Sequence, residues 1–186
     1  MQSVIIPNSI EDIGKHAFSG CQNLISVSIP ESVANIGCDA FSNCCNLTSV
    51  TIPDSAWKIG SGAFSDCRSL TSATIPAGVK IIGNAMFFGC HNLSSVTIPA
   101  GVTRIGWRAF CDCYNLTSIT IPEGVKAIDD EAFLACSNLT AVTIPKSVKD
   151  IGPGTFFGCS NLTIHAPAGS CAERYAKEHK IRFVAR

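Results

Sequence analysis

The chain has 186 residues, and its 14 Lys and Arg balance 14 Asp and Glu, so the formal net charge at neutral pH is zero. Apolar residues make up 46% of the sequence and charged residues 15%, a composition that indicates a packed core and not a disordered chain. The neutral balance argues against nucleic acid and anionic membranes as partners, and no apolar run is long enough for membrane insertion. Residues 1–7 lack the features of a signal peptide, so we expect a cytosolic protein or one whose leader has been removed.

A repeat of 23 residues organises almost the whole chain. Proline, phenylalanine, cysteine and leucine each recur seven times at this step, without an insertion between copies. The phenylalanines are Phe18, Phe41, Phe64, Phe87, Phe110, Phe133 and Phe156, and the cysteines are Cys21, Cys44, Cys67, Cys90, Cys113, Cys136 and Cys159. One unit of this length cannot bury its apolar face alone, so the pattern predicts a solenoid of about seven stacked coils.

Each repeat begins with a short predicted strand. In the second copy Leu47, Val50 and Ile52 alternate with hydroxyl residues, which indicates a strand with one buried face. Pro53 ends the strand because proline cannot donate to a sheet, and turn residues follow. In the segment 40–44, Ala-Phe-x-x-Cys, the spacing of three and four predicts one helical turn that faces inward. Adjacent strands are expected to pair in parallel at roughly 4.8 Å, which gives a rod of about 35 Å.

The repeat signature stops near residue 169. Ser170 and Glu173 have the spacing of a capping box, which predicts a helix through Lys180, and a strand is expected over 181–184. We therefore divide the chain into a repeat array over 1–169 and a C-terminal cap, helix plus short strand, over 170–186. At the other end Met1 stands where a leucine is expected and no capping segment precedes it. This predicts a fragment of a longer array, or an uncapped first coil that could self-associate end to end or edge to edge.

The stretch from Leu47 to Cys67 resembles the BspA-type, or Treponema pallidum-type, leucine-rich repeat. The resemblance is carried by Leu-x-x-Val-x-Ile-Pro, by the Ala-x-x-Ile-Gly that follows and by Ala-Phe-x-x-Cys, and it extends over about residues 1–169. Similar repeats occur in surface and secreted proteins of gut and oral bacteria and of Trichomonas. The resemblance implies an α/β leucine-rich-repeat solenoid, with a parallel sheet on the concave face and short helical turns on the convex side. It also implies binding or adhesion without catalysis, with a protein or glycan on a host or neighbouring cell as partner.

The eleven cysteines invite a metal or catalytic interpretation, which their spacing does not support. Seven occur once per coil beside a phenylalanine, so we predict that they are buried, reduced thiols. Paired Cys-x-x-Cys motifs of a zinc site are absent from the sequence, and no histidine repeats with the cysteines to act as a base. We therefore expect a protein without metal, cofactor or enzymatic activity. The thiols outside the repeat are expected to be the most exposed, and whether they form a disulfide stays open: Cys38, Cys45, Cys111 and Cys171.

An asparagine precedes the leucine in six of the seven copies: Asn23, Asn46, Asn92, Asn115, Asn138 and Asn161. We expect these side chains to point inward and to bond backbone groups of neighbouring coils. Five of them lie in the acceptor pattern for N-glycosylation. Because a glycan at a buried asparagine would disrupt the core, this interpretation favours a bacterial origin.

The outward positions of the predicted strands form the candidate binding face. In the middle coils these positions hold Ser49, Thr51, Ser72, Thr74, Ser95, Thr97, Ser118 and Thr120. With the outer coils included, 12 of the 14 outward positions hold Ser or Thr. Such a face either binds a polypeptide or glycan through its hydroxyls, or reflects only the preference of threonine for solvated strands. Three aromatic residues are the second choice for binding, because aromatic side chains are enriched at interfaces: Trp57, Trp107 and Tyr114.

The leading functional hypothesis is a non-enzymatic binding or adhesion module of a bacterial cell-surface or secreted protein. The alternative is a structural spacer stalk that presents another domain and has no ligand of its own. The near-identity of the coils fits the stalk almost as well, because a dedicated site usually requires coils that differ where they contact the ligand.

Overall fold

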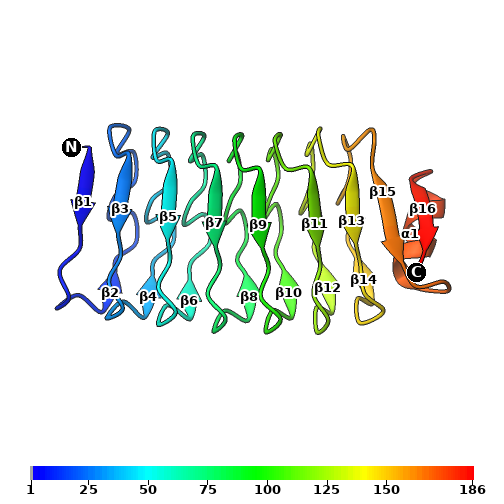
Figure 1. The fold of residues 1–186 in the computed structure, drawn as a ribbon, viewed down its shortest axis with the longest axis horizontal. Coiled ribbons are helices and arrows are strands. Elements are labelled where there is room, and N and C mark those ends of the chain that lie inside the picture. Colours follow the sequence, from blue (N-terminus) through cyan, green and yellow to red (C-terminus); the bar gives the residue numbers. More distant parts are fainter. Residues whose placement is uncertain (1) are drawn as a thin grey trace.

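The computed structural model describes residues 2–186 and confirms the predicted solenoid, with about eight coils stacked side by side (Figure 1). The main sheet contains one short strand from each coil and one from the C-terminal segment: β1 (Ser3–Ile5), β3 (Ser26–Ser28), β5 (Ser49–Thr51), β7 (Ser72–Thr74), β9 (Ser95–Thr97), β11 (Ser118–Thr120), β13 (Ala141–Thr143), β15 (Thr163–Ala166) and β16 (Arg182–Ala185). A second set of two-residue strands follows the proline turns: β2 (Asp12–Ile13), β4 (Asn35–Ile36), β6 (Lys58–Ile59), β8 (Ile81–Ile82), β10 (Arg104–Ile105), β12 (Ala127–Ile128) and β14 (Asp150–Ile151).

All strand pairs are parallel, and the register places most residues beside their own copy in the next coil. Ser49 pairs with Ser26 on one side and with Ser72 on the other. The main sheet forms two hydrogen-bonded parts, β1 to β9 and β11 to β16, and the second sheet is divided between β6 and β8. In the last coil the step falls from 23 to 22, so Ala141 pairs with Thr163. This shift follows from the sequence, because the last copy is one residue shorter before its proline.

The third side of each coil, here called the arc, is a chain of turns and not the predicted helical turn. In the arc 38–44, the amides of Asp39, Phe41 and Asn43 donate to carbonyls of the next coil. Each of the intervening amides donates to the carbonyl of the residue three positions earlier in the same coil. Asp39 and Asn43 have φ of 54° and 58°, and the same two positions are left-handed in the other arcs. A helix would direct every amide along its own axis, so these left-handed residues are what turn alternate amides toward the neighbouring coil.

Two columns of residues, phenylalanine and cysteine, run through the interior beside buried leucine, isoleucine and valine side chains. The seven repeat phenylalanines form one continuous stack, with neighbouring ring centroids 5.1–5.7 Å apart and nearly parallel planes. In six coils the cysteine Sγ donates to the carbonyl of the phenylalanine in the preceding coil, over 3.1–3.3 Å. The buried cysteine thus bonds across the coil boundary beside the aromatic stack, which links each coil to the one before it.

The prediction of buried thiols holds for six of the seven repeat cysteines and is wrong for Cys21, which is exposed. Cys21 lies in the first coil, so its thiol has no earlier phenylalanine carbonyl to contact. The prediction that Cys111 is exposed is also wrong, since only 2% of it is accessible. Cys111 occupies the arc column of Ser42 and Ser65, which are buried as well. The other three off-repeat cysteines are half-buried: Cys38, Cys45 and Cys171. All eleven cysteines are free thiols.

The prediction that the asparagine column points inward is wrong. All six asparagines are exposed, because the inward position at this corner is taken by the leucine that follows each of them. Asn46 Nδ2 donates to the Gln22 carbonyl over 2.7 Å, and Asn115 Nδ2 donates to Asn92 Oδ1 over 3.1 Å. These side chains connect neighbouring coils at the surface. The argument for a bacterial origin from buried glycosylation acceptors therefore fails.

After the last coil the chain forms α1 (Cys171–Glu178) and then β16. Ser170 is the N-cap, and its Oγ accepts from the Glu173 amide at 3.2 Å, as the capping box predicted. The return bond differs, because Glu173 Oε2 accepts from the Gly169 amide and not from the amide of the N-cap. Tyr175 faces inward and meets the last ring of the phenylalanine stack edge-on, with centroids 5.9 Å apart. The helix therefore covers part of the end of the core.

Candidate functional site

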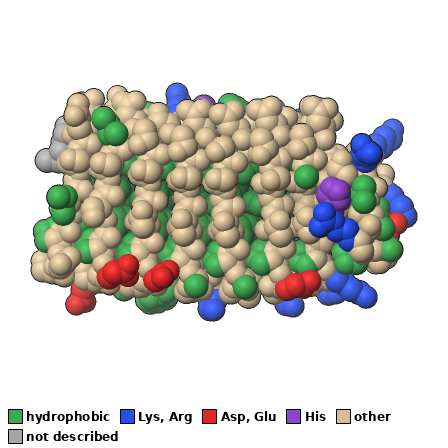
Figure 2. Space-filling model, in the orientation of Figure 1, with side chains coloured by type: hydrophobic (Ala, Val, Ile, Leu, Met, Phe, Trp, Pro, Cys, Tyr) green, Lys and Arg blue, Asp and Glu red, His purple; other side chains and the backbone are tan. Residues whose placement is uncertain are grey.

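The outward residues of the main sheet form a continuous polar surface, here called the hydroxyl face. It consists of the eight predicted residues of β5, β7, β9 and β11, and all are exposed: Ser49, Thr51, Ser72, Thr74, Ser95, Thr97, Ser118 and Thr120. The residues between them, such as Val50 and Ala73, point into the core. Figure 2 shows this side of the molecule almost free of charged side chains over the middle coils, with acidic groups along one edge and basic groups toward the C-terminal end.

The register arranges the hydroxyl face in two rows. Serines pair with serines, as Ser72 does with Ser95, and threonines with threonines, as Thr74 does with Thr97. Within residues 2–186, none of the eight hydroxyls makes a side-chain hydrogen bond of the kind that Thr71 donates to the Thr48 carbonyl. The hydroxyls are therefore available to a ligand, either as donors or as acceptors.

The C-terminal end of the same sheet differs, and sequence reasoning missed it. His165 on β15 occupies the row of Thr143, and Arg182 on β16 occupies the row of Thr163. Arg182 is exposed and His165 is half-buried. The shortened last copy was the available signal, because it shifts the strand by one residue relative to the repeat. The hydroxyl rows therefore end beside one guanidinium and one imidazole.

The three second-choice aromatic residues do not come together. Trp57 precedes β6 and Trp107 follows β10, so both flank the second sheet, with exposed fractions of 59% and 42%. Tyr114 is 39% exposed and lies between an arc and the main sheet, stacked on His91 at 4.7 Å. No single ligand surface combines all three.

Trp107 borders a shallow groove of about 540 Å³, which also contains Ile81 and Arg104. Arg104 Nε donates to both carboxylate oxygens of Asp129 at 2.9 Å, and the guanidinium of Arg108 lies 4.5 Å from the Trp107 ring centre. Arg104 and Asp129 are thus already paired with each other, whereas Asp130 and Asp150 line the groove without an ion pair among residues 2–186.

Two of the buried thiols, Cys44 and Cys111, have little nucleophilic character. Burial raises the pKa of Cys44 to about 12, and burial together with the neighbouring Asp112 raises the pKa of Cys111 to about 12. A thiol with such a pKa stays protonated at neutral pH, whereas the thiolate is the nucleophile and the metal ligand. Residues 2–186 contain no cluster of three or more metal-ligating side chains. No helix in this part of the chain is long and apolar enough to cross a bilayer.

Comparison with known proteins agrees with the geometry. Six copies of the BspA type leucine-rich repeat region match residues 1–114 and 57–172. The leucine-rich repeat protein of T. pallidum superimposes with a TM-score of 0.81 and 32% identity, over 99% of this chain and 86% of that one. A leucine-rich repeat protein from Eubacterium ventriosum gives 0.79 and 30%, over 85% of this chain and 43% of the other.

A leucine-rich cell surface protein from Faecalibacterium prausnitzii gives a TM-score of 0.52 and 26% identity, over 95% of this chain and 62% of the other. The chain thus spans less than two thirds of the E. ventriosum and F. prausnitzii proteins. No curated protein matches the sequence. The repeat match covers far more than half of the residues, and the chain belongs to the BspA-type leucine-rich repeat family.

Proposed function

We propose that the chain is a non-enzymatic binding module of a bacterial cell-surface or secreted protein, and that the hydroxyl face binds its partner. Proteins built from leucine-rich repeats are generally protein-interaction modules. The observation that carries the proposal is the set of eight exposed hydroxyls, none with a side-chain hydrogen bond within residues 2–186. The name of the F. prausnitzii protein supports the location at a cell surface.

The chemistry of the face defines the partner. Serine and threonine side chains are short, so a ligand has to approach the sheet closely and offer polar groups at the repeat of the strands, roughly 4.8 Å. An extended polypeptide or a glycan chain can do both. Because the middle of the face carries no charge, its affinity should depend only weakly on salt, unlike that of a complex formed by electrostatic steering.

The alternative is the spacer stalk, and the uniformity of the face favours it. Serine follows serine along one row and threonine follows threonine along the other. Uniform coils suit repetitive, weak contacts or no contact at all. The two functions differ in one measurable respect, since a stalk binds no surface partner through this face.

The test uses the double variant T74K/T97K, which places two charges in the centre of the face. Binding would be measured by surface plasmon resonance against a panel of immobilised extracellular-matrix glycoproteins and mucin, each also in deglycosylated form. The proposal predicts binding by the parent and a loss of at least about tenfold in the variant. The deglycosylated panel separates a glycan partner from a polypeptide partner.

The matched control is S61K/A77K, which adds the same charge at two exposed positions away from the face. We expect this control to bind like the parent. Full affinity in T74K/T97K would place the partner elsewhere, with Trp57 or Trp107 as the next residues to replace. No binding by the parent to any member of the panel would favour the stalk.

A further inference from the structure

The last arc differs from all the others in its hydrogen bonds. In every earlier arc, alternate amides donate to carbonyls of the next coil, as Glu131, Phe133 and Ala135 do to the last arc. The equivalent amides of the last arc belong to Gly154, Phe156 and Gly158. None of these three has a backbone acceptor within residues 2–186, because the chain continues into α1 and not into another arc.

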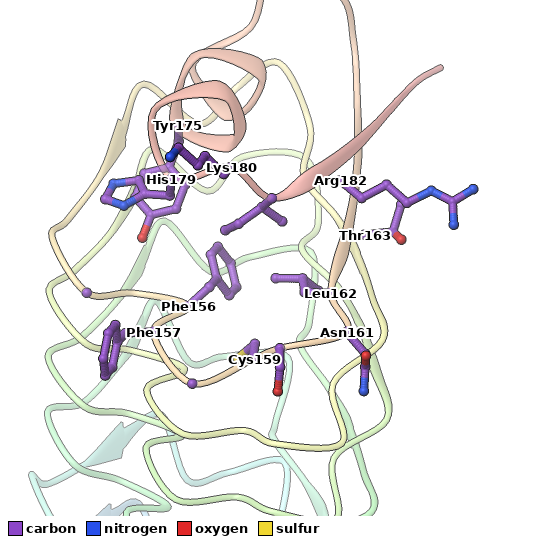
Figure 3. Close-up of a pocket in the computed structure, with 14 residues that line it drawn as sticks. Phe156, Phe157, Cys159, Asn161, Leu162, Thr163, Tyr175, His179, Lys180 and Arg182 are labelled. Carbon is purple, nitrogen blue, oxygen red and sulfur yellow. The ribbon is translucent and has the colours of Figure 1, made fainter.

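A groove of about 710 Å³ lies over this arc, between the last coil and the C-terminal segment (Figure 3). Gly154 and Gly158 both line it. Its apolar surface comes from the following side chains: Phe156, Phe157, Leu162, Tyr175 and Ile181. Phe157 is 75% exposed, whereas its equivalent in the previous repeat, Leu134, is half-buried under the next coil. The groove thus occupies the place where a further arc would stack.

Tyr175 closes only the middle of the groove. Figure 3 shows its ring on α1 facing Phe156 across the gap. Burial of Tyr175 raises the pKa of its hydroxyl, as expected for a side chain packed against the end of the core. The ring thus covers the arc at Phe156. The amides of Gly154 and Gly158 remain open on either side of it.

The charge of the groove has one sign. His179, Lys180 and Arg182 line it, and no aspartate or glutamate does. Lys180 and Arg182 are exposed, and neither forms an ion pair among the described residues, in contrast to Lys177, which pairs with Glu173 at 2.7 Å. The groove thus offers open backbone donors and apolar side chains beside unpaired positive charge.

We propose that this groove binds an extended acidic peptide segment of a partner protein. The carbonyls of the peptide would accept from the Gly154 and Gly158 amides, as a further arc would, in the manner of a peptide that adds to an open sheet edge. An apolar side chain of the peptide would cover Phe157, one carboxylate would pair with Lys180, and another would reach Arg182 where the peptide leaves the groove on the Thr163 side (Figure 3). This site adjoins the end of the hydroxyl rows at Arg182 but uses none of the eight hydroxyls, and it does not depend on the function proposed for them.

The experiment is a titration of the full chain, labelled with ¹⁵N, with an N-acetylated, C-amidated peptide in which glutamate alternates with phenylalanine and valine. We expect the amide signals of Gly154 and Gly158 to move more than those of the hydroxyl face. A peptide with lysine in place of glutamate should not shift these signals. Absence of any shift with the glutamate peptide, or shifts confined to the main sheet, would overturn the proposal.

Two variants test the charge. K180E/R182E should weaken binding of the glutamate peptide at least about tenfold, because two attractive contacts become repulsive. The matched control K58E/K126E makes the same change at exposed lysines of the coils, and it should bind like the parent. Equal weakening in both double variants would mean that only overall charge matters, which contradicts a specific groove. Binding by T74K/T97K should be unchanged, so failure of one proposal can be told apart from failure of the other.

Discussion

Inside the solenoid each phenylalanine stacks on its copy in the next coil at 5.1–5.7 Å, and outside it each threonine of the hydroxyl face pairs in register with another threonine. Both columns repeat with the same period, but their environments differ. A core phenylalanine such as Phe87 has no accessible surface, whereas the threonine side chains are exposed and unbonded within residues 2–186. Packing explains the uniformity of the first column. The second column is a candidate for binding because its hydroxyls are exposed and unbonded among the described residues, and not because it is uniform.

The comparison implies that stability depends on the interior columns and scarcely on the face. Repeat arrays hold together through contacts between neighbouring coils, so damage to an interior column spreads to the coils on either side. Changes on the face should leave these contacts intact.

Alkaline pH should destabilise the protein strongly through its buried thiols. Burial raises the pKa of five cysteines: Cys44, Cys67, Cys90, Cys111 and Cys113. In the unfolded chain a thiol loses its proton near pH 8.5, so above that pH the folded state binds more protons and the free energy of unfolding falls. Below pH 8 this contribution is fully present. The loss is about 1.4 kcal/mol per thiol per pH unit, or on the order of 10 kcal/mol for five thiols at pH 10.

The measurement is urea unfolding at a series of pH values from 7 to 10, with a reductant present. The variant C113A is the control, because it removes one of the five thiols and should flatten the fall between pH 9 and 10 by about one fifth. A free energy of unfolding that is constant across this range would contradict the burial of the cysteine column.

Loss of one ring from the phenylalanine stack is the next largest effect. F87A should lower the free energy of unfolding by about 3–5 kcal/mol, because it removes a fully buried ring between two others. F157A is the matched control. Since Phe157 is largely exposed, its loss should change stability by less than about 0.5 kcal/mol. Similar melting temperatures for F87A and F157A would mean that the stack does not carry the stability assigned to it.

The cysteine column should make a smaller contribution at neutral pH. C113A removes one buried sulfur and the bond from its Sγ to the Phe87 carbonyl at 3.3 Å, and we expect a loss of about 1 kcal/mol. C21A changes the equivalent residue of the first coil, which is exposed, and should have almost no effect. Chemical denaturation at pH 7 measures both. Equal losses in the two variants would show that burial does not decide the effect.

The interior could be predicted from the sequence because each buried column has one residue type at a fixed step. Phenylalanine, cysteine and leucine at a period of 23 determine which residues face inward, and the parallel register follows from stacking equal units. The same logic placed the outward residues of the strands, such as Thr74 and Thr97, because side chains alternate along a strand. Here local patterns and tertiary contacts indicate the same structure.

The arc and the asparagine column could not be predicted in the same way. The spacing of Phe41 and Cys44 fits a helical turn equally well, and only the bonds to the next coil select the left-handed residues Asp39 and Asn43. The repetition of asparagine suggested burial, yet the bond from Asn46 to the Gln22 carbonyl connects coils at the surface. Repetition therefore shows that a residue contacts its neighbours in adjacent coils, but it does not show whether that contact is buried or exposed.

The smallest expected effect is on the hydroxyl face itself. T74K/T97K should change the free energy of unfolding by less than about 0.5 kcal/mol, because both side chains are exposed and neither makes a hydrogen bond that lysine would break. A73K places the same side chain one residue earlier on β7, where the strand faces the core and only 7% of the residue is accessible. It should cost several kcal/mol, on the order of 3 or more, since a buried ammonium has no partner there. Guanidinium denaturation of the two variants therefore tests the alternation of the strand directly. If T74K/T97K loses as much stability as A73K, the threonine rows are part of the packed structure, and their hydroxyls are not free to bind a partner.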